Sequence, residues 1–246
     1  MTTLVLLHAF PLDAGMYAPV ADVFDGDLLT PNLSGFGGTD VPDEEPSLDV
    51  YADHVARELD AAGLHRVVIG GTSMGGYTAM AFCRRHRNRV AGLALIDTKA
   101  SADGEAAAAG RRAMAEVMRE SGSTEPLLEN VYPKLLGVTT LSQRVELSAS
   151  VRASVSAAPP AAAAWAQLAM ATRPDSLPTL AEINVPALVV VGAEDVLSPP
   201  SDAEEMADVL PDGELVVIAD AGHLTPLEAP AEVVSALQGL MRRVDG

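Results

Sequence analysis

The sequence predicts an α/β fold: a mostly parallel sheet of about six strands with helices on both faces. Two observations carry this prediction. Short apolar segments of strand length alternate with longer helical patterns along the chain, and that order is typical of a parallel, doubly wound sheet with right-handed crossovers. The short segments are also apolar almost throughout, as expected of strands that are buried on both faces.

Each predicted strand is a run rich in leucine or β-branched residues. In chain order, the runs are Leu4–Leu7, a weaker one at Asp27–Thr30, Arg66–Ile69, Val90–Ile96, Ala187–Val191 and Glu214–Ile218. Helical patterns lie between them at Met16–Phe24, Ser47–Ala62, Gly75–Arg87, Ser201–Leu210 and Ala229–Arg243. With 246 residues, the chain is long enough for one large domain with a full hydrophobic core.

Residues 98–180 interrupt the alternation, because they contain no convincing strand. They hold alanine-rich amphipathic patterns that predict helices at Ala102–Glu120, Glu125–Leu136, Thr140–Val155 and Pro160–Thr172. Such a segment is too long for a simple crossover between two strands. We therefore expect residues 1–97 and 181–246 to form the core domain, and residues 98–180 to form an all-helical lid over the strand ends.

Composition and charge exclude several classes of function. The net charge of −18 repels nucleic-acid phosphates and anionic lipid headgroups, so we expect neither nucleic acid nor a membrane as a partner. No apolar run approaches the ~20 residues of a membrane-spanning helix, and the first run, Leu4–Leu7, is typical of a core strand rather than a signal peptide. Cys83 is the single cysteine, so the sequence predicts no disulfide, no metal site and a cytoplasmic location.

The main chemical signal is the segment GTSMG, residues 71–75, between a predicted strand and a predicted helix. A serine on a sharp strand-to-helix turn has a strained backbone, and bulky residues two positions to either side would collide. Glycine at positions 71 and 75 removes those collisions. We therefore expect Ser73 to be a nucleophile.

A serine hydroxyl needs an adjacent base, and the chain has five histidines. His223 follows the last predicted strand, so it lies at the carboxyl edge of the sheet, where sites in such folds assemble. His8, which ends the first strand, is a rival. Surface or capping positions suit the other three, which are His54, His65 and His86.

The base in turn needs an acid that orients it. Glu194 and Asp195 both follow the strand Ala187–Val191, and both are chemically suitable. The second position is preferred because the shorter aspartate side chain suits a loop that leaves a strand. The chain order of serine, acid and histidine is that of one hydrolase class, in contrast to other triad enzymes.

Acyl transfer also needs backbone N–H groups that stabilise an oxyanion. The N–H of Met74 is one candidate, because Met74 follows the nucleophile. The second candidate is the N–H of Phe10, in the loop after the first strand, since Pro11 has no N–H to donate.

Several of these segments resemble one known family. The segment HAFPLD at residues 8–13 resembles the oxyanion loop of α/β-hydrolase esterases, non-haem perhydrolases and enol-lactonases, and residues 32–37 resemble the loop after their next strand. Residues 71–76, 173–176, 192–199 and 221–230 match further signatures of the family. The resemblance implies an α/β-hydrolase fold, a triad of Ser73, Asp195 and His223, and no cofactor.

The sequence departs from that family at three points. Ala9 replaces the usual glycine of the oxyanion loop, and alanine tolerates fewer backbone conformations. Asn32 stands where members often carry aspartate. The first strand pair of longer members is missing, and for this reason we expect about six strands rather than eight.

The predicted activity is hydrolysis of a small carboxylic ester or lactone. A serine at position 73 counts against the members that need a nucleophilic aspartate. Perhydrolysis or haloperoxidation without a cofactor, and hydrolysis of a carbon–carbon bond, remain open because they use the same triad. A hydrolase-like sensor that only binds a ligand is the alternative of another class.

The predicted substrate pocket is apolar, lined by Phe10, Leu197, Leu224 and Trp165, and suits an uncharged acyl chain. The net charge of −18 also disfavours anionic substrates. An arginine of the predicted lid is a candidate local partner for a carboxylate; these are Arg111, Arg112, Arg119, Arg144, Arg152 and Arg173. The sequence leaves the oligomeric state open.

Overall fold

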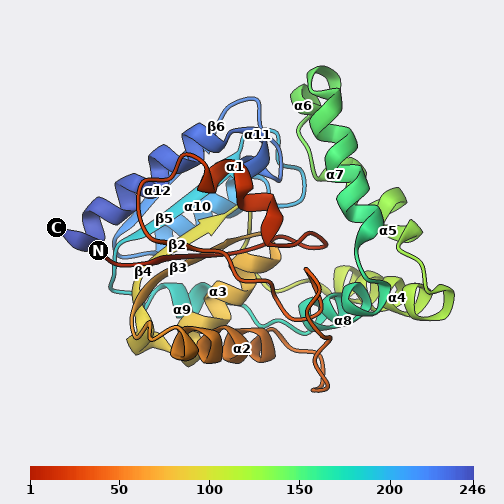
Figure 1. Ribbon diagram of the computed structural model, residues 1–246, viewed down its shortest axis with the longest axis horizontal. Helices are drawn as coiled ribbons and strands as arrows, with labels where there is room; N and C mark the ends of the chain where they lie inside the picture. Colours follow the sequence, from red (N-terminus) through yellow and green to blue (C-terminus); the bar gives the residue numbers. More distant parts are fainter.

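The computed structural model describes residues 1–246 and contains one parallel sheet of six strands (Figure 1). The strands are β1 (Leu4–Leu7), β2 (Leu28–Leu29), β3 (Val67–Thr72), β4 (Val90–Ile96), β5 (Ala187–Gly192) and β6 (Gly213–Ile218). Their order is β2-β1-β3-β4-β5-β6, and every neighbouring pair is parallel. The predicted number of strands and their direction are confirmed.

The four central strands, β1, β3, β4 and β5, are buried along their whole length, as predicted. The two edge strands, β2 and β6, are less buried. In β6 Glu214 is exposed and the Val217 side chain is 48% exposed, so the prediction of burial on both faces is wrong for this strand. The reason is its place at the end of the sheet, beyond β5. Strand β3 is longer than predicted, since it continues through Gly70 and Gly71 to Thr72.

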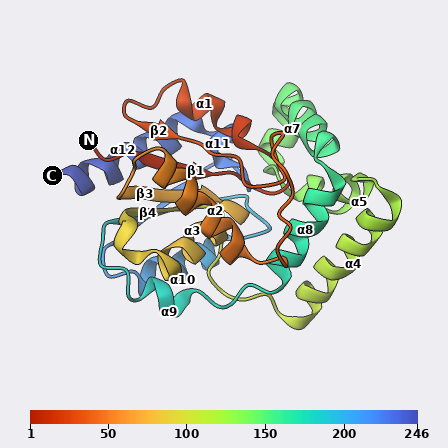
Figure 2. The same cartoon turned by 60° about the horizontal axis from the view of Figure 1, so that its bottom comes forward.

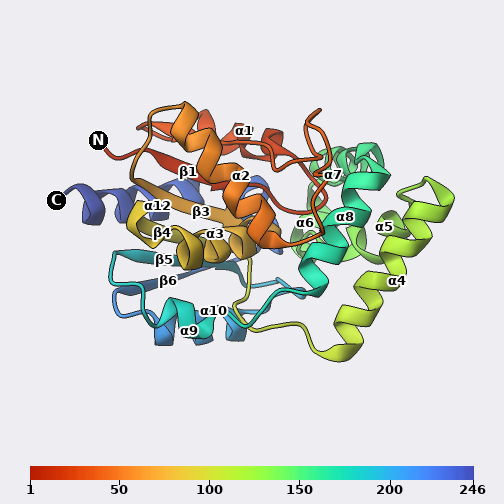
Figure 3. The same cartoon turned by 90° about the horizontal axis from the view of Figure 1, so that it is seen from below.

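Helices cover both faces of the sheet (Figure 3). On one face lie α1 (Ala18–Ala21) and α12 (Pro230–Asp245), which pack against each other. The other face carries α2 (Leu48–Ala61), α3 (Met74–Arg85), α9 (Leu177–Leu180) and α10 (Pro200–Val209). The short α11 (Thr225–Glu228) precedes α12.

The first predicted helix, Met16–Phe24, is the least accurate in the core. It is a 3-10 turn, Ala14–Tyr17, followed by the single turn α1. Pro19 is the second residue of α1; it has no backbone N–H and is tolerated only in the first turn of a helix, so no α-helix runs through it. A further 3-10 turn at Arg87–Arg89 precedes β4.

Five helices lie between β4 and α9, at the end of the sheet opposite the chain termini (Figure 1). They are α4 (Glu105–Ser121), α5 (Glu125–Asn130), α6 (Val138–Gln143), α7 (Val145–Ala157) and α8 (Pro160–Ala171). Figure 2 shows α4 beside α8, and these two helices pack along each other. We call α4 to α8 the helical segment.

Two predicted helices of the helical segment are broken. The pattern Glu125–Leu136 gives α5 and a separate 3-10 turn, Tyr132–Lys134, because Pro133 cannot continue an α-helix. The pattern Thr140–Val155 gives α6 and α7, which are separated at Arg144, where the backbone leaves the helical region (φ −121°, ψ 64°). No helix of the chain combines the length and the hydropathy needed to cross a membrane.

Candidate active site

Ser73 lies on the sharp turn between β3 and α3 with a strained backbone (φ 54°, ψ −112°). A non-glycine residue adopts such a conformation only where its surroundings enforce it. Here the Ser73 N–H donates to Ile96 O at 2.9 Å, and the Thr98 hydroxyl donates to Ser73 O at 2.9 Å. Both bonds come from the β4 side, and they hold the serine at the carboxyl end of the sheet.

The two glycines that flank the turn are required by close backbone approaches. A Cβ on Gly75 would collide with the carbonyl oxygen of Leu7, at the end of β1. A Cβ on Gly71 would collide with the backbone of Gly75 itself. The turn therefore folds tightly enough to expose Ser73 only because neither position carries a side chain.

Three predicted residues meet at this turn. His223 Nε2 lies 2.8 Å from Ser73 Oγ, and His223 Nδ1 lies 2.8 Å from Asp195 Oδ2. The histidine follows β6 and the aspartate follows β5, so parallel strands deliver all three side chains to the same edge. His223 and Asp195 are buried, and Ser73 is partly exposed.

The adjacent carboxylates Glu194 and Asp195 bind different partners. Asp195 Oδ1 accepts from the backbone N–H groups of Leu197 (2.8 Å) and Ser198 (3.1 Å), which aims Oδ2 at His223. The Ser198 hydroxyl donates to Asp195 Oδ2 at 3.1 Å. Glu194 instead accepts from the N–H and the hydroxyl of Thr139, on α6, at 2.9 and 2.6 Å.

The rival histidine, His8, is held in a structural role. It is fully buried, its Nε2 accepts from Leu33 N–H at 3.0 Å, and its Nδ1 lies 3.1 Å from Ala9 O. Burial lowers the pKa of His8 to about 4, so the ring is neutral and its two nitrogens are occupied. It forms no hydrogen bond with Ser73.

The other three histidines lie away from the turn. His54 Nδ1 is 2.6 Å from Ser34 Oγ, His86 Nε2 is 2.8 Å from Asp53 Oδ1, and His65 is exposed.

Charge around His223 favours its protonated form. Burial lowers the pKa of His223, but the negative charge of Asp195 and its hydrogen bond, followed by Asp97 and Glu228, outweigh burial, so the pKa lies above its ordinary value. Asp97 is a second buried carboxyl, which sequence reasoning missed. It accepts from Gly192 N–H at 3.1 Å and from the N–H and hydroxyl of Thr225 at 2.8 and 2.7 Å. Burial, and then the charge of Asp195, raise the pKa of Asp97.

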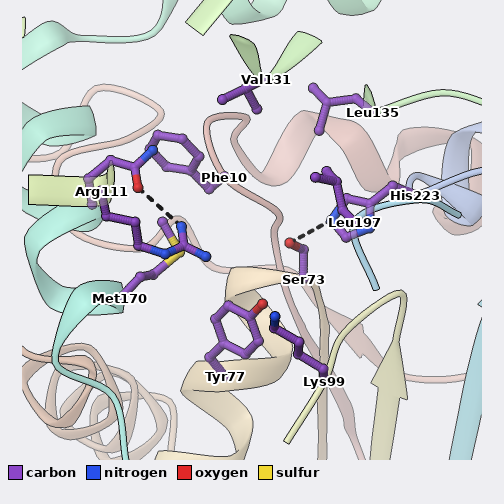
Figure 4. Close-up of a pocket in the computed structure, with 11 residues that line it drawn as sticks. Phe10, Ser73, Tyr77, Lys99, Arg111, Val131, Leu135, Met170, Leu197 and His223 are labelled. Atoms are coloured by element: carbon purple, nitrogen blue, oxygen red, sulfur yellow. Dashed lines mark hydrogen bonds between the residues drawn. The ribbon is translucent and has the colours of Figure 1, made fainter. Parts of the chain in front are cut away.

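A cavity of about 120 Å³ opens at Ser73 (Figure 4). It lies between the core and the helical segment, and its lining is Phe10, Ser73, Tyr77, Lys99, Arg111, Val131, Leu135, Gln167, Met170, Leu197 and His223. Only 6 of these 11 residues are hydrophobic. The expectation of an apolar pocket therefore needs correction, because its floor and one wall are polar.

Two of the four predicted lining residues, Phe10 and Leu197, border this cavity, and the other two do not. Leu224 is fully buried within the hydrophobic core. Trp165 faces away from it: the ring packs on Tyr51 of α2, with centroids 4.7 Å apart, and the indole N–H donates to Glu44 O at 3.1 Å. Trp165 therefore packs α8 against the core domain through Tyr51 and the Glu44 carbonyl.

The two backbone groups expected to face an oxyanion belong to residues on either side of the nucleophile's turn, Phe10 after β1 and Met74 at the start of α3. Phe10 lines the cavity, and its N–H donates to no acceptor of the chain. Met74 is the first residue of α3, so its N–H belongs to the helix N-terminus beside Ser73. Ala9, which replaces the usual glycine, is buried and its N–H donates to Met16 Sδ at 3.2 Å.

Sequence reasoning missed the buried Asp97 and three cavity residues with polar groups, Tyr77, Lys99 and Gln167, although a signal existed for all but Gln167. Asp97 and Lys99 directly follow β4, and the rule that identified Asp195 and His223 applies equally to the end of that strand. Tyr77 lies one helical turn after Ser73 in α3, so it shares the face of the helix that begins at the nucleophile. No cluster of three or more His, Cys, Asp or Glu side chains is arranged to hold a metal ion.

Comparison with known proteins agrees with this architecture. A family model described as alpha/beta hydrolase fold matches residues 2–230. The chain is similar to a thermophilic esterase from Thermogutta terrifontis, with 38% identity, a TM-score of 0.94, and coverage of 100% of this chain and 91% of that one.

Two further relatives cover nearly the whole chain. A pimeloyl-[acyl-carrier protein] methyl ester esterase from Aromatoleum aromaticum is 28% identical over 251 residues, which covers 97% of this chain and 98% of that protein. An enol-lactonase from Burkholderia xenovorans is 23% identical with a TM-score of 0.88, covering 98% of this chain and 92% of that one. The second likeness concerns the fold alone.

Proposed function

The chain belongs to the α/β-hydrolase family and is an ester-hydrolysing enzyme, and we propose that it cleaves a small carboxylic ester or lactone through an acyl-enzyme on Ser73. One observation carries this proposal: His223 joins Ser73 Oγ on one side and Asp195 Oδ2 on the other, each at 2.8 Å. These distances suit proton transfer from the serine to the base, and orientation of the base by the acid.

The first half of the reaction forms the acyl-enzyme. Ser73 Oγ attacks the substrate carbonyl carbon while His223 Nε2 takes the hydroxyl proton. The imidazolium that results is stabilised by Asp195 at Nδ1. When the tetrahedral intermediate collapses, His223 gives the proton to the leaving oxygen, and the ester C–O bond breaks.

The second half releases the acid. Water enters where the alcohol left, His223 takes one of its protons, and the hydroxide adds to the acyl carbon. The second tetrahedral intermediate expels Ser73 Oγ, which recovers its proton from His223. No step needs a cofactor or a metal ion.

The oxyanion is assigned to the N–H groups of Phe10 and Met74. Two observations support this choice: the Phe10 N–H has no acceptor within the chain, and Met74 begins α3 directly after the nucleophile. A helix N-terminus adds a partial positive charge at the same place.

The helical segment is assigned the role of a lid. Val131, Leu135 and Met170 reach the cavity from it, so it closes the side of the site that the sheet leaves open. Its α6 end is tied to the loop of Asp195 by Glu194, as described above, and to the loop of His223 by Glu228, which accepts from Gly137 N–H at 2.9 Å and Gly222 N–H at 3.0 Å.

Perhydrolysis and carbon–carbon bond hydrolysis need the same triad, and no contact in the cavity favours either of them. The cytoplasmic location stays a prediction from the single cysteine.

The deciding experiment compares wild type with Ser73→Ala on 4-nitrophenyl acetate. We expect the variant to lose activity by ~10⁴-fold or more with an unchanged urea unfolding midpoint. Ser154→Ala, an exposed serine of α7, is the matched control and should keep wild-type turnover. If Ser73→Ala keeps a tenth of the activity, the assigned nucleophile is wrong. If wild type releases one equivalent of nitrophenol and stops, the protein is a ligand-binding protein rather than an esterase.

A further inference from the structure

The polar wall of the cavity presents hydrogen-bond donors without acceptors. Lys99 Nζ has no hydrogen-bond acceptor, since its nearest carboxylate oxygen, Asp103 Oδ1, lies 3.7 Å away. Arg111 uses Nε and Nη1, leaving the two N–H groups of Nη2 free. The hydroxyl of Tyr77 also bonds to no protein atom, and both Tyr77 and Lys99 line the cavity, drawn below Ser73 in Figure 4. A neutral acyl chain would leave these donors unmatched.

The positions of these cations are fixed by one buried carboxylate. Asp103, 2% exposed, binds Arg173 at 2.8 Å and Arg111 at 2.5 Å, with Lys99 at the longer distance. Burial raises the pKa of Asp103, but Arg111, then Arg173 and Lys99, outweigh burial and hold that pKa below its ordinary value. The ionised Asp103 carboxylate is therefore the shared partner of Arg173, Arg111 and Lys99.

Positive charge is in excess at this cluster. Asp202 is a further carboxyl near Lys99 and Arg173: burial raises its pKa, and the charges of these two residues act in the opposite direction. Three cations, Lys99, Arg111 and Arg173, therefore stand against the two carboxylates Asp103 and Asp202.

A purely structural cluster would not need all three cations. Arg173 is the buried member, 3% exposed, and it also donates to Ser101 O and stacks over Tyr77 at 4.2 Å. The Lys99 and Arg111 side chains are 24% and 23% exposed, and both line the cavity. Arg173 and Asp103 therefore have a structural role. Lys99 and Arg111 keep N–H groups that have no acceptor within the protein.

The arrangement also indicates which half of an ester they face. The leaving oxygen must lie at His223 Nε2, because it receives the proton there. In Figure 4 the Arg111 guanidinium lies across the cavity from His223, with Lys99 and Tyr77 below Ser73. A substrate whose leaving oxygen lies at His223 would therefore extend its acyl half toward Arg111, Lys99 and Tyr77.

We propose that Lys99 and Arg111, with the Tyr77 hydroxyl, form a carboxylate-binding subsite, and that the preferred substrates are esters or lactones whose acyl half carries a free carboxylate. This inference rests on the proposed function and reverses the expectation of an uncharged acyl chain. A carboxylate accepts about four hydrogen bonds, and the free donors of the three side chains can supply them. Hydrogen bonds to charged groups contribute about 10-fold to 100-fold each in affinity.

The test uses substrates that differ only in charge. Monomethyl esters of succinic, glutaric and adipic acid are compared with the methyl esters of the corresponding monoamides, which have the same shape and no charge. Methanol release gives kcat and KM for each. We expect the acid of at least one chain length to exceed its amide in kcat/KM by about 10-fold or more.

Substitutions of the basic residues test which side chains cause the preference for the acid over the amide. Lys99→Met and Arg111→Gln should each reduce the ratio of acid to amide in kcat/KM by about 10-fold, mainly through a higher KM for the acid. Arg112→Gln removes the same charge from the next position of α4, where the side chain is exposed, and should leave the ratio unchanged. Urea unfolding midpoints within error of wild type establish that each variant is folded, and Lys99→Arg, which keeps the charge, should retain the preference if Lys99→Met loses stability.

The inference is overturned if the ratio is near one at all three chain lengths, or if neither Lys99→Met nor Arg111→Gln lowers it. Those outcomes leave the proposed esterase intact, because 4-nitrophenyl acetate reports on it separately. Absence of any turnover that Ser73→Ala abolishes would overturn both.

Discussion

Glu194 and Asp195 show how much the function of a side chain depends on one step along the backbone. Both carboxylates follow β5, but the loop turns Asp195 toward His223 and Glu194 toward Thr139. We therefore expect Asp195→Asn to lower kcat by about 10⁴-fold, because the amide cannot stabilise the imidazolium and can favour the wrong tautomer. Glu194→Gln, the matched control, should cost less than about tenfold. A larger loss from the glutamate substitution would reverse the assignment.

The pH profile reports the state of His223. Only the neutral imidazole can accept the serine proton, and the charge of Asp195 raises the pKa of His223 above its ordinary 6.5 despite burial. Activity should therefore fall as the pH drops through this raised pKa, so the midpoint of kcat/KM against pH lies above 6.5. Asp195→Asn removes the largest raising influence and should move the midpoint to lower pH. A profile that is flat from pH 5 to 8 is incompatible with a histidine base.

At the residue scale, the sequence predicts the groups that the sheet itself delivers. Ser73, Asp195 and His223 each follow a strand, so position along the chain is enough to bring them to one edge. Trp165 and Arg111 lie on helices whose rotation about their axes decides which side chain faces the cavity. That rotation depends on tertiary contacts such as Trp165 with Tyr51, and these contacts leave no local pattern in the sequence.

At the scale of elements, Glu228 connects the helical segment to the loop that carries His223. Its carboxylate accepts from the N–H groups of Gly137, Gly222 and Leu224, at 2.9 to 3.1 Å, and it is 7% exposed. Glu228→Gln replaces one oxygen by an amide that donates, which leaves at least one buried N–H without an acceptor. We expect a loss of about 2 kcal/mol in the free energy of unfolding, measured by urea denaturation.

A matched substitution separates this effect from simple loss of charge. Glu232→Gln changes an exposed glutamate in the first turn of α12, and it should change the free energy of unfolding by less than about 0.5 kcal/mol. Equal effects of the two substitutions would mean that the three N–H contacts of Glu228 contribute nothing specific.

The elements that the sequence predicts well are those whose ends are marked locally. Ser47 caps α2 through Asp49 N–H at 3.2 Å, and the apolar runs of β1 and β4 end where predicted. The helical segment is harder, because its composition favours helix throughout and the breaks at Pro133 and Arg144 are single residues. A proline in a helical pattern is a visible signal, whereas the break at Arg144 has none in the sequence. There the arginine donates to the carbonyl groups of Leu227 and Glu228, a contact across the fold.

At the scale of the whole molecule, the protein carries a net negative charge, whereas the charged side chains that line its cavity include the positive Lys99 and Arg111. The net charge of −18 is spread over the surface, while Lys99 and Arg111 border the cavity. The sequence gives the first quantity directly, and for that reason it favours an uncharged substrate. The second quantity depends on which few charges fold together, and composition does not contain that information.

This opposition predicts how salt affects an anionic substrate. At an ionic strength of about 0.01 M the screening length is ~30 Å, so an approaching anion senses most of the molecule's negative charge; at about 0.1 M it is ~10 Å, and the charges that line the cavity dominate. Raising the ionic strength across this range should therefore increase kcat/KM for monomethyl glutarate through a lower KM. The neutral amide ester should not respond, and it is the control. In Lys99→Met the increase should persist from a lower starting value, since the long-range repulsion is unchanged. A steady decrease for wild type from the lowest salt upward would contradict the prediction, because it would mean that an approaching anion is attracted at every distance.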